Sequence, residues 1–362
     1  MRIQHQEEDF SALELEWKKL EKIDETCPIF LRYEWTACWI KHFGEQYETV
    51  ILTARDNTSS TLIGILPLMC RKRKGITNGE WRFLGDSREI CPDHLDVIAE
   101  NVNKATVTRS FLFYLSQSPK FDNCTFDHVS ERSCLVSLAS DNDVHDIFWT
   151  GLFLARKCFY IPLQDTLKCS KRLIRYERRL KVEFNACFKE ASSTDDMLHA
   201  FNELTRLHSL RWSQLGQSGA FHDSRVLAFH KSIIAGLGEQ GLIKMFFLSL
   251  GQRIVSVLYV FVYNNIIHGY ASGFDPEFAK YSVGNVLLAS ALREAIRCNY
   301  SEFDFLRGNE HYKENWTESC RPDWRIHYHK KSILGFVSLV NHKLHVDVIT
   351  CMRRLKKWLS NR

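Results

Sequence analysis

Residues 242–275 read LIKMFFLSLGQRIVSVLYVFVYNNIIHGYASGFD, and they show the clearest strand pattern in the chain. It holds three runs rich in β-branched and aromatic residues, at 242–250, 253–263 and 266–275. Only the pairs Gly-Gln and Asn-Asn separate these runs, and such pairs are typical of tight hairpin turns. The stretch therefore predicts an antiparallel meander of three strands.

The residues that follow predict a helix at 282–299 and a further strand at 301–308. Ser282 is a favoured N-cap residue, and Gly284 lets a ligand approach the backbone closely. The unpaired amides at the start of a helix can hold a phosphate group. The cofactor-binding residues predicted here are Ser282, Val283, Gly284 and Asn285. The alternative is that Ser282 only caps a structural helix.

The stretch EFDFLRGNEHYKENW, residues 302–316, combines a strand with a polar cluster. Phe303 and Phe305 alternate with Asp304, which makes Asp304 either a solvated edge residue or a site residue. After this strand come Arg307, Gly308, Glu310, His311, Tyr312, Lys313 and Glu314. Polar groups gathered at a strand end indicate a ligand site, and the alternative is an ion-paired loop over an edge strand.

The first part of the chain shows a similar order of elements. Its patterns predict helices at 10–22, 33–43 and 103–119, and strands at 48–56, 60–74, 93–100, 123–129 and 157–163. Between the two meanders, the patterns predict helices at 169–181, 195–216 and 224–240 and a strand at 182–191, and a last strand follows at 324–330. The order of helices, meander, helix and return strand thus occurs twice, which indicates a duplicated mixed α/β fold.

Composition sets further bounds on the class of protein. A chain of 362 residues exceeds the usual size of one core, and 45% hydrophobic with 25% charged residues is ordinary for a globular protein. We expect neither a membrane span nor a signal peptide, because no long apolar run is present. The 12 cysteines form no C-x-x-C pair, so we expect reduced, cytoplasmic thiols. His327 and His329 could share one strand face, but two histidines alone do not predict a metal, and we expect none.

Two segments carry most of the basic charge. Residues 168–181 hold seven basic residues against one acidic, and residues 330–362 hold eight against one. The remainder of the chain is mildly acidic, which argues against DNA as the main partner. The segment at 168–181 is either a solvated helix face or a clamp for phosphate. Residues 331–362 predict a basic amphipathic helix, which either packs on the domain or contacts anionic lipid.

Several of these motifs together resemble a known family. FLRYEWTACWIKHFG, LIGILPLM, RFLGD, LHSLRWSQLGQSGAF, YASGFDPEFAKYSVGNVLL and FDFLRGNEHYKENW are similar to GNAT acyltransferases of the CelD/BcsL type, which carry a BioF-like acetyltransferase domain and are related to Fem peptidyltransferases. The resemblance covers roughly residues 25–330. It implies tandem GNAT-like domains at 1–165 and 166–330, each a mostly antiparallel central sheet flanked by helices, with catalysis mainly in the second domain.

The resemblance also implies roles for particular residues. An acyl thioester would lie between the strands at 266–275 and 301–308, with Asp304 or His268 as base and Tyr281 or Tyr312 as acid. Arg211 and Trp212 would lie beside the acceptor pocket, although a tryptophan on a helix is more often a core residue. Arg307, Glu310 and Lys313 are the other predicted substrate-binding residues, and Glu310 with Lys313 could instead order the loop by pairing.

Three functional hypotheses follow from the resemblance. The first is an N-acyltransferase that uses acyl-CoA, such as acetyl-CoA, and an amine acceptor of a polysaccharide or lipid precursor. Residues 280–285, KYSVGN, contain one glycine where a GNAT phosphate loop has more, so a carrier protein or aminoacyl-tRNA donor stays open. A Fem-like transferase is therefore the second hypothesis. The third is a non-catalytic module of a polysaccharide-assembly system.

Overall fold

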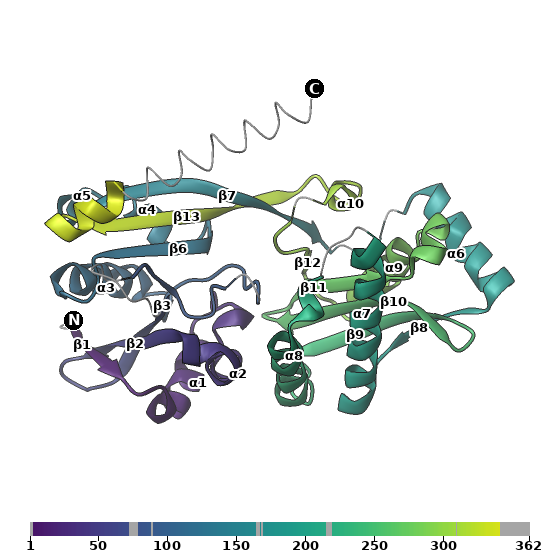
Figure 1. Cartoon of the computed structure of the whole chain (residues 1–362), viewed down its shortest axis with the longest axis horizontal. Helices are drawn as coiled ribbons and strands as arrows, with labels where there is room; N and C mark the ends of the chain where they lie inside the picture. Colours follow the sequence, from purple (N-terminus) through teal and green to yellow (C-terminus); the bar gives the residue numbers. More distant parts are fainter. Residues whose placement is uncertain are drawn as a thin grey trace, which may run out of the picture.

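The computed structural model describes residues 3–71, 79–87, 90–163, 167, 169–214, 219–308 and 310–340 (Figure 1). Within these ranges, thirteen strands form one sheet, in the order β1-β2-β3-β4-β6-β13-β7-β12-β11-β10-β9-β8, and β5 pairs with β3 off this path. The first half contains β1 (Ile3–Glu8), α1 (Glu14–Ile23), α2 (Tyr33–Phe43), β2 (Tyr47–Asp56), β3 (Leu62–Arg71), β4 (Trp81–Phe83), β5 (Ile98–Ala99), α3 (Lys104–Gln117), β6 (Asn123–Ser130), α4 (Cys134–Leu138), α5 (Asn142–Ile147) and β7 (Phe148–Pro162).

The second half repeats this order. It contains α6 (Lys171–Phe184), β8 (Ala186–Glu190), α7 (Thr194–Gln214), α8 (Ser224–Leu237), β9 (Ile243–Leu250), β10 (Arg253–Tyr263), β11 (Ile266–Phe274), α9 (Val283–Arg297), β12 (Glu302–Asp304), α10 (His311–Glu314) and β13 (Cys320–Lys330). In each half, two helices precede an antiparallel meander, and a helix then leads to a strand that runs parallel to the last meander strand. The predicted duplicated α/β fold is confirmed.

The meander quoted at the outset forms as predicted. β9, β10 and β11 pair antiparallel, and the turn between β10 and β11 has Asn264 at φ 49° and Asn265 at φ 61°. Both residues are in the left-handed region that a tight hairpin turn requires and that asparagine tolerates. β10 is buried along nearly its whole length because helices cover both faces of this part of the sheet. α7 and α8 pack on one face, and α9 packs on the other.

The two halves exchange strands at the centre of the sheet. β7 follows the first half, yet its last residues, Tyr160 to Pro162, pair with β12 of the second half. β13 follows the second half and pairs with β6 of the first, and β7 and β13 also pair with each other from Phe148–Lys330 to Phe159–Cys320. Figure 1 shows these two long strands crossing between the halves. The predicted division at residue 165 stays a prediction.

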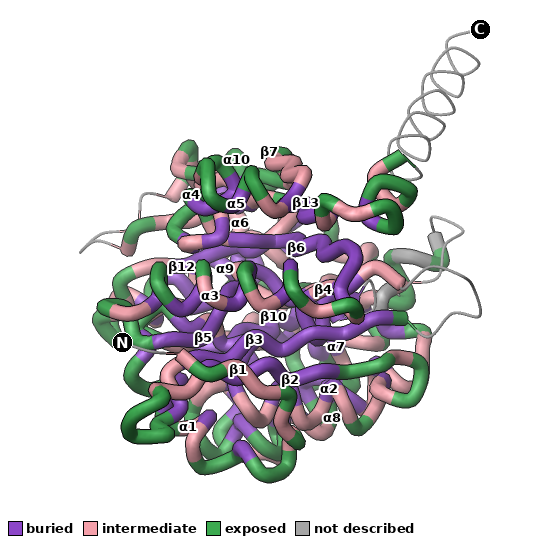
Figure 2. Tube along the Cα trace, turned by 90° about the vertical axis from the view of Figure 1, so that its left-hand side faces the viewer, coloured by how far each residue is buried: buried purple, intermediate pink, exposed green. Residues whose placement is uncertain are grey.

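The halves also share a hydrophobic core. The Trp35 ring of α2 lies 5.0 Å from Phe229 of α8, and 5.5 Å from Phe261 of β10. Figure 2 shows that the buried residues follow the strands through the molecule, while the helices carry the exposed positions. The first half therefore supports one face of the sheet in the second half.

Some elements differ from the sequence predictions. The strand predicted at 157–163 is the end of β7, which begins at Phe148, and the strand predicted at 93–100 is reduced to β5. The strand predicted at 182–191 begins only at Ala186, because α6 continues to Phe184. The helix predicted from Phe10 starts with a 3-10 turn, and α1 begins at Glu14. Residues 341–362 of the predicted C-terminal helix lie outside the described residues.

Candidate active site

The strands β11 and β12 separate soon after they pair. Ile266, Ile267 and His268 pair in parallel with Glu302 to Asp304, and β11 then continues to Phe274 with β10 as its partner. The register on β10 shifts between Tyr259 and Val260, which places a bulge at Tyr270. Bulges occur beside active sites, where they redirect side chains. One edge of β11 beyond His268 is thus left without a strand partner among the described residues.

Gly269 stands where this opening begins. A Cβ atom at Gly269 would lie 2.9 Å from the Phe303 ring and 3.5 Å from the Asp304 carbonyl oxygen. This approach leaves no room for a side chain, so glycine is required at this position. Beyond it, Ala271 is half-buried and Ser272 is exposed. Solvent therefore reaches β11 at Ser272.

The N-terminus of α9 lies at the far end of β11. Ser282 has a left-handed backbone (φ 52°), and its side chain makes no capping hydrogen bond. The prediction of a Ser282 side-chain cap was therefore wrong. A capping serine needs an extended backbone, and Ser282 has a left-handed one. The amides of Val283, Gly284 and Asn285 lie in the first helical turn, which has no intrahelical acceptor for them. Asn285 is not free to turn toward a ligand, since its Oδ1 accepts a hydrogen bond from Trp316 Nε1 at 3.1 Å.

Three cations from different elements surround this helix start. Arg179 of α6 and Lys280 each lie 5.2 Å from the Tyr281 ring centroid. Arg211, near the end of α7, lies 5.4 Å from the ring centroid of Phe274, whose side chain contacts the Gly284 position. A helix N-terminus with cations around it is a good site for an anionic group.

The polar cluster after β12 forms an ordered loop. Lys313 is buried, and its Nζ donates to the carbonyl oxygens of Arg307 at 2.7 Å and Phe305 at 3.2 Å. It also pairs with the Glu310 carboxylate at 2.9 Å. Gly308 has φ +123°, a conformation that other residues rarely adopt. The geometry thus favours the loop-ordering alternative for Lys313 and Glu310 over direct substrate binding.

Arg307 connects this loop to the first half of the chain. Its Nε donates to Asp93 Oδ1 at 2.6 Å, and its amide donates to Asp93 Oδ2 at 2.8 Å. The guanidinium also contacts the Pro92 carbonyl oxygen. These contacts occupy much of the guanidinium, so Arg307 is better placed to fix the loop than to bind an acceptor.

Asp304 is fully buried and bonded on both oxygens. Oδ1 accepts from the Leu306 amide at 2.7 Å, and Oδ2 lies 2.9 Å from His94 Nε2 and 2.5 Å from an Arg321 nitrogen. Burial raises the pKa of Asp304, but His94 and Arg321 outweigh it and hold the pKa well below its usual range. Burial lowers the pKa of His94, which the Asp304 and Asp323 carboxylates then hold well above its usual value. A carboxylate in this state is a weak base, so the structure argues against Asp304 as the general base.

The other predicted catalytic residues differ in their surroundings. His268 is buried beside Asp304, burial lowers its pKa to about 4, and its Nδ1 has no hydrogen-bond partner among the described residues. Tyr281 is a core residue under Arg179 and Lys280. Tyr312 lies 6.1 Å from Phe305, ring to ring, and its pKa is raised by removal from water and by Glu310. Trp212 lies in α7, and its side chain is outside the described part of the structure.

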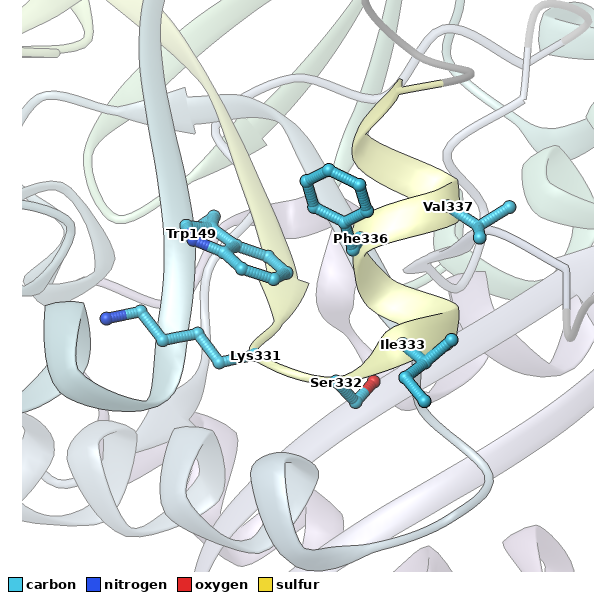
Figure 3. A pocket seen from close by; sticks show the side chains of 6 residues that line it. All are labelled: Trp149, Lys331, Ser332, Ile333, Phe336 and Val337. Carbon is cyan, nitrogen blue, oxygen red and sulfur yellow. The ribbon is translucent and has the colours of Figure 1, made fainter.

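The predicted histidine pair lies at the other end of the β7–β13 ribbon. The rings of His327 and His329 lie 6.2 Å apart on one strand face, and the described residues supply no third metal ligand within reach. A shallow apolar hollow lies nearby, between β7 and the segment after β13 (Figure 3). It is lined by Trp149, Lys331, Ser332, Ile333, Phe336 and Val337. This hollow is separate from the β11–β12 opening, since Lys330 pairs with Phe148 and Cys320 with Phe159.

Comparisons with known proteins agree with the geometry of the second half. Residues 168–314 match the family model described as the acetyltransferase (GNAT) domain. The second half of the chain is thus similar to a GNAT acetyltransferase domain, and the β11–β12 opening lies within the matched residues. No curated protein matches the chain.

Solved structures resemble the chain over nearly its whole length. FemX matches with a TM-score of 0.58 at 10% identity, covering 89% of this chain and 96% of FemX. The C-terminal DUF2156 domain of a candidate lysylphosphatidylglycerol synthetase from Agrobacterium fabrum matches with a TM-score of 0.56 at 10% identity, covering 91% and 96%. A conserved protein of unknown function from Bacteroides thetaiotaomicron also has a TM-score of 0.56, at 12% identity, covering 91% and 100%. At these identities the similarity shows the fold alone.

Proposed function

We propose that this protein is an N-acyltransferase that takes an acyl group from a phosphate-bearing thioester, with acyl-CoA as the donor, and transfers it to an amine. The observation that carries the proposal is the path that the β11 edge, which lacks a strand partner among the described residues, makes with the start of α9 where Gly284 meets Phe274. Three cations surround the end of this path. The path suits a ligand with amide groups along its length and phosphate at one end.

In this proposal the protein acts mainly by positioning. The donor's amides pair with the β11 edge, and its phosphates bind the amides of Val283 and Gly284. The thioester carbonyl then lies where β11 and β12 separate, near His268 and the loop ordered by Lys313. Holding two reactants in an attack geometry can supply a large part of the rate enhancement.

We propose His268 rather than Asp304 as the group that accepts the amine proton, because of its available ring nitrogen and not because of its pKa, which burial also lowers. The Nδ1 atom of His268 has no hydrogen-bond partner among the described residues, whereas both Asp304 oxygens are occupied. The amine nitrogen bonds to the carbonyl carbon, the carbon–sulfur bond breaks, and the thiolate leaves with the donor. Tyr312 stays protonated because its pKa is raised, so it can donate a hydrogen bond to that thiolate.

Calorimetry with acetyl-CoA tests the donor site. Arg179→Ala should weaken binding by about tenfold, because one of the three cations is lost. Arg178→Ala is the matched control, since Arg178 is exposed on the same helix. If acetyl-CoA does not bind, or if both variants bind like wild type, the donor site is wrong.

A second candidate donor is aminoacyl-tRNA, and one observation favours it. The exposed face of α6 carries Lys171, Arg172, Arg175, Arg178, Arg179 and Lys181. Such a face suits a long polyanion, and the chain shares the fold of FemX. Transfer from charged tRNA with no binding of acetyl-CoA would select this candidate. Failure of both donors would favour the non-catalytic module.

The subfamily and the location in the cell both depend on which amine is the acceptor. We propose membership of the CelD/BcsL type and an acceptor from cell-envelope polysaccharide or lipid synthesis, with the protein in the cytoplasm near the membrane. No helix in the described ranges is both long enough and apolar enough to span a bilayer. After β13, Ile333, Phe336, Val337 and Val340 are exposed apolar residues, which supports contact with a surface such as lipid. Sedimentation with anionic vesicles at low salt tests this contact, and failure to bind would remove it.

A further inference from the structure

Three buried side chains from distant parts of the sequence converge where the two halves meet. Asp93 lies in the loop after β4, His128 near the end of β6, and Asp323 in β13. One ligating atom from each lies within 4.8 Å of the other two. His128 Nδ1 is 3.6 Å from Asp93 Oδ1 and 3.9 Å from Asp323 Oδ2. All three residues are at least nine-tenths buried, so water from bulk solvent does not surround them.

Two of these atoms have no hydrogen-bond partner among the described residues. They are His128 Nδ1 and Asp323 Oδ2, which face each other across the 3.9 Å separation. Buried polar atoms normally have partners, and an atom without one needs an explanation. A lone pair on an imidazole nitrogen and one on a carboxylate oxygen can both be satisfied by a single cation between them.

The net charge of the groups around the cluster is negative, so a bound cation would be stabilised. Five carboxylates lie in or beside the cluster, from Asp93, Asp127, Asp304, Asp323 and Glu302, and three guanidinium groups contact them directly, from Arg307, Arg321 and Arg325. These groups leave two negative charges. A divalent cation offsets both. Arg156 is exposed and acts only at longer range.

Asp93 and Asp323 also accept hydrogen bonds from neighbouring side chains, as carboxylates that bind metals usually do. Arg307 holds both oxygens of Asp93, at 2.6 and 2.8 Å, and His94 Nδ1 lies 3.2 Å from Asp323 Oδ1. Such contacts orient ligating carboxylates in metal sites. Ligands of one ion lie about 3.0–3.4 Å apart when each is about 2.1 Å from the metal. The observed His128 separations need to close only slightly.

We infer that Asp93, His128 and Asp323 form a binding site for one divalent transition-metal ion with nitrogen and oxygen ligands. The site links the loop after β4 to β6 and β13, so the ion would tie the exchanged strand β13 to the first half. Its role would be structural, since the site is buried and its three ligands come from the loop after β4, from β6 and from β13 rather than from β11. The inference does not depend on the proposed acyl transfer.

Cobalt is the probe that tests the site, because the absorption of Co²⁺ reports its ligands. The full-length chain is expressed in medium supplemented with Co²⁺, so that the ion is present while the protein folds. It is then dialysed against metal-free buffer. Elemental analysis of wild type should find about one cobalt per chain, and His128→Gln should fall to about one tenth of this or less. His128→Gln removes a nitrogen that has no hydrogen-bond partner, so the fold should survive, and circular dichroism checks this.

Two further variants make the assignment specific. His311→Gln changes a histidine with a side chain that is 98% exposed and should retain the cobalt. Cys158→Ser should also retain it, and wild type should show cobalt d–d bands without a thiolate charge-transfer band. A thiolate band would place the ion on the neighbouring group of His94, Cys158 and Asp323 and overturn this assignment. Absence of cobalt from wild type, or equal cobalt in His128→Gln, would overturn the site itself and indicate an adventitious ion only.

Discussion

Asp304→Asn separates a positioning role from a catalytic one. The substitution keeps the size of the side chain and removes the charge that faces Arg321 at 2.5 Å and His94 at 2.9 Å. Asp304 is fully buried, so these two groups lose a partner that water cannot replace. Removing one partner from a buried ion pair typically costs about 3–5 kcal/mol of folding free energy. We therefore expect Asp304→Asn to act first on stability.

This cost converts into a measurable shift of the melting temperature. The unfolding entropy is about 2.1 cal/mol/K per residue, or about 0.76 kcal/mol/K if all 362 residues unfold together. A loss of 3–5 kcal/mol then lowers the midpoint by about 4–7 °C. Scanning calorimetry measures the shift. Glu277→Gln is the control, because its side chain is 65% exposed in its pair with Arg253 and should cost at most about 1 kcal/mol.

Turnover at 25 °C provides the second readout. Release of free CoA thiol, in the presence of an amine that wild type acylates, should fall by less than about tenfold, because Asp304 touches neither donor nor acceptor in the proposed geometry. A general base would instead cost about 10²-fold or more. An unchanged melting temperature together with a fall in turnover of about 10²-fold or more would refute the positioning role and indicate that Asp304 is the general base.

Substitutions at three other positions test separate parts of the structure. Gly284→Ala should bind acetyl-CoA like wild type, since a Cβ there meets Phe274 at an ordinary 3.5 Å. Gly284→Val should lower the affinity measured by calorimetry by about tenfold or more, because its methyl groups cover the helix amides. Lys313→Met should lower the free energy of unfolding in urea by about 2–4 kcal/mol, since several loop carbonyls lose their donor; a loss under 1 kcal/mol would show that Lys313 does not order the loop. Burial raises the pKa of Glu21 from 4.5 to about 7, so the folded state holds its proton more tightly and stability should fall by up to about 3 kcal/mol as the pH rises from 4.5 to 7. Glu21→Gln should flatten this dependence, and an identical pH profile in the variant would exclude Glu21 as its source.

Local patterns predicted the second half of the fold well. The runs around Asn264 and Asn265 combine strand residues with a turn that asparagine favours, so the meander could be read directly. The start of β7 was missed because Phe153 and Leu154 are exposed there and the expected alternation is lost. β5 and α4 are too short to show a period. The exchange of β7 and β13 involves partners far apart in sequence, which no local pattern encodes.

The candidate site was predictable in part. The cluster after Asp304 and the glycine at the start of α9 were visible in the sequence, but their contacts were not. Arg307 pairs with Asp93 across more than two hundred residues, and Lys313 turns inward to the loop carbonyls. The buried group of Asp93, His128 and Asp323 was missed because its three members are isolated in sequence. The spacing of these residues in the sequence does not predict the group, since each residue belongs to a different element.

In the proposed complex, the acyl donor binds along β11 with its phosphates at the start of α9. A crystal structure of the protein with acetyl-CoA tests it most directly. We predict that the thioester lies between β11 and β12 beyond His268, and that the pyrophosphate contacts the amides of Val283 and Gly284 near Arg179. Electron density for CoA in the first half, or with its pyrophosphate away from α9, would contradict the claim.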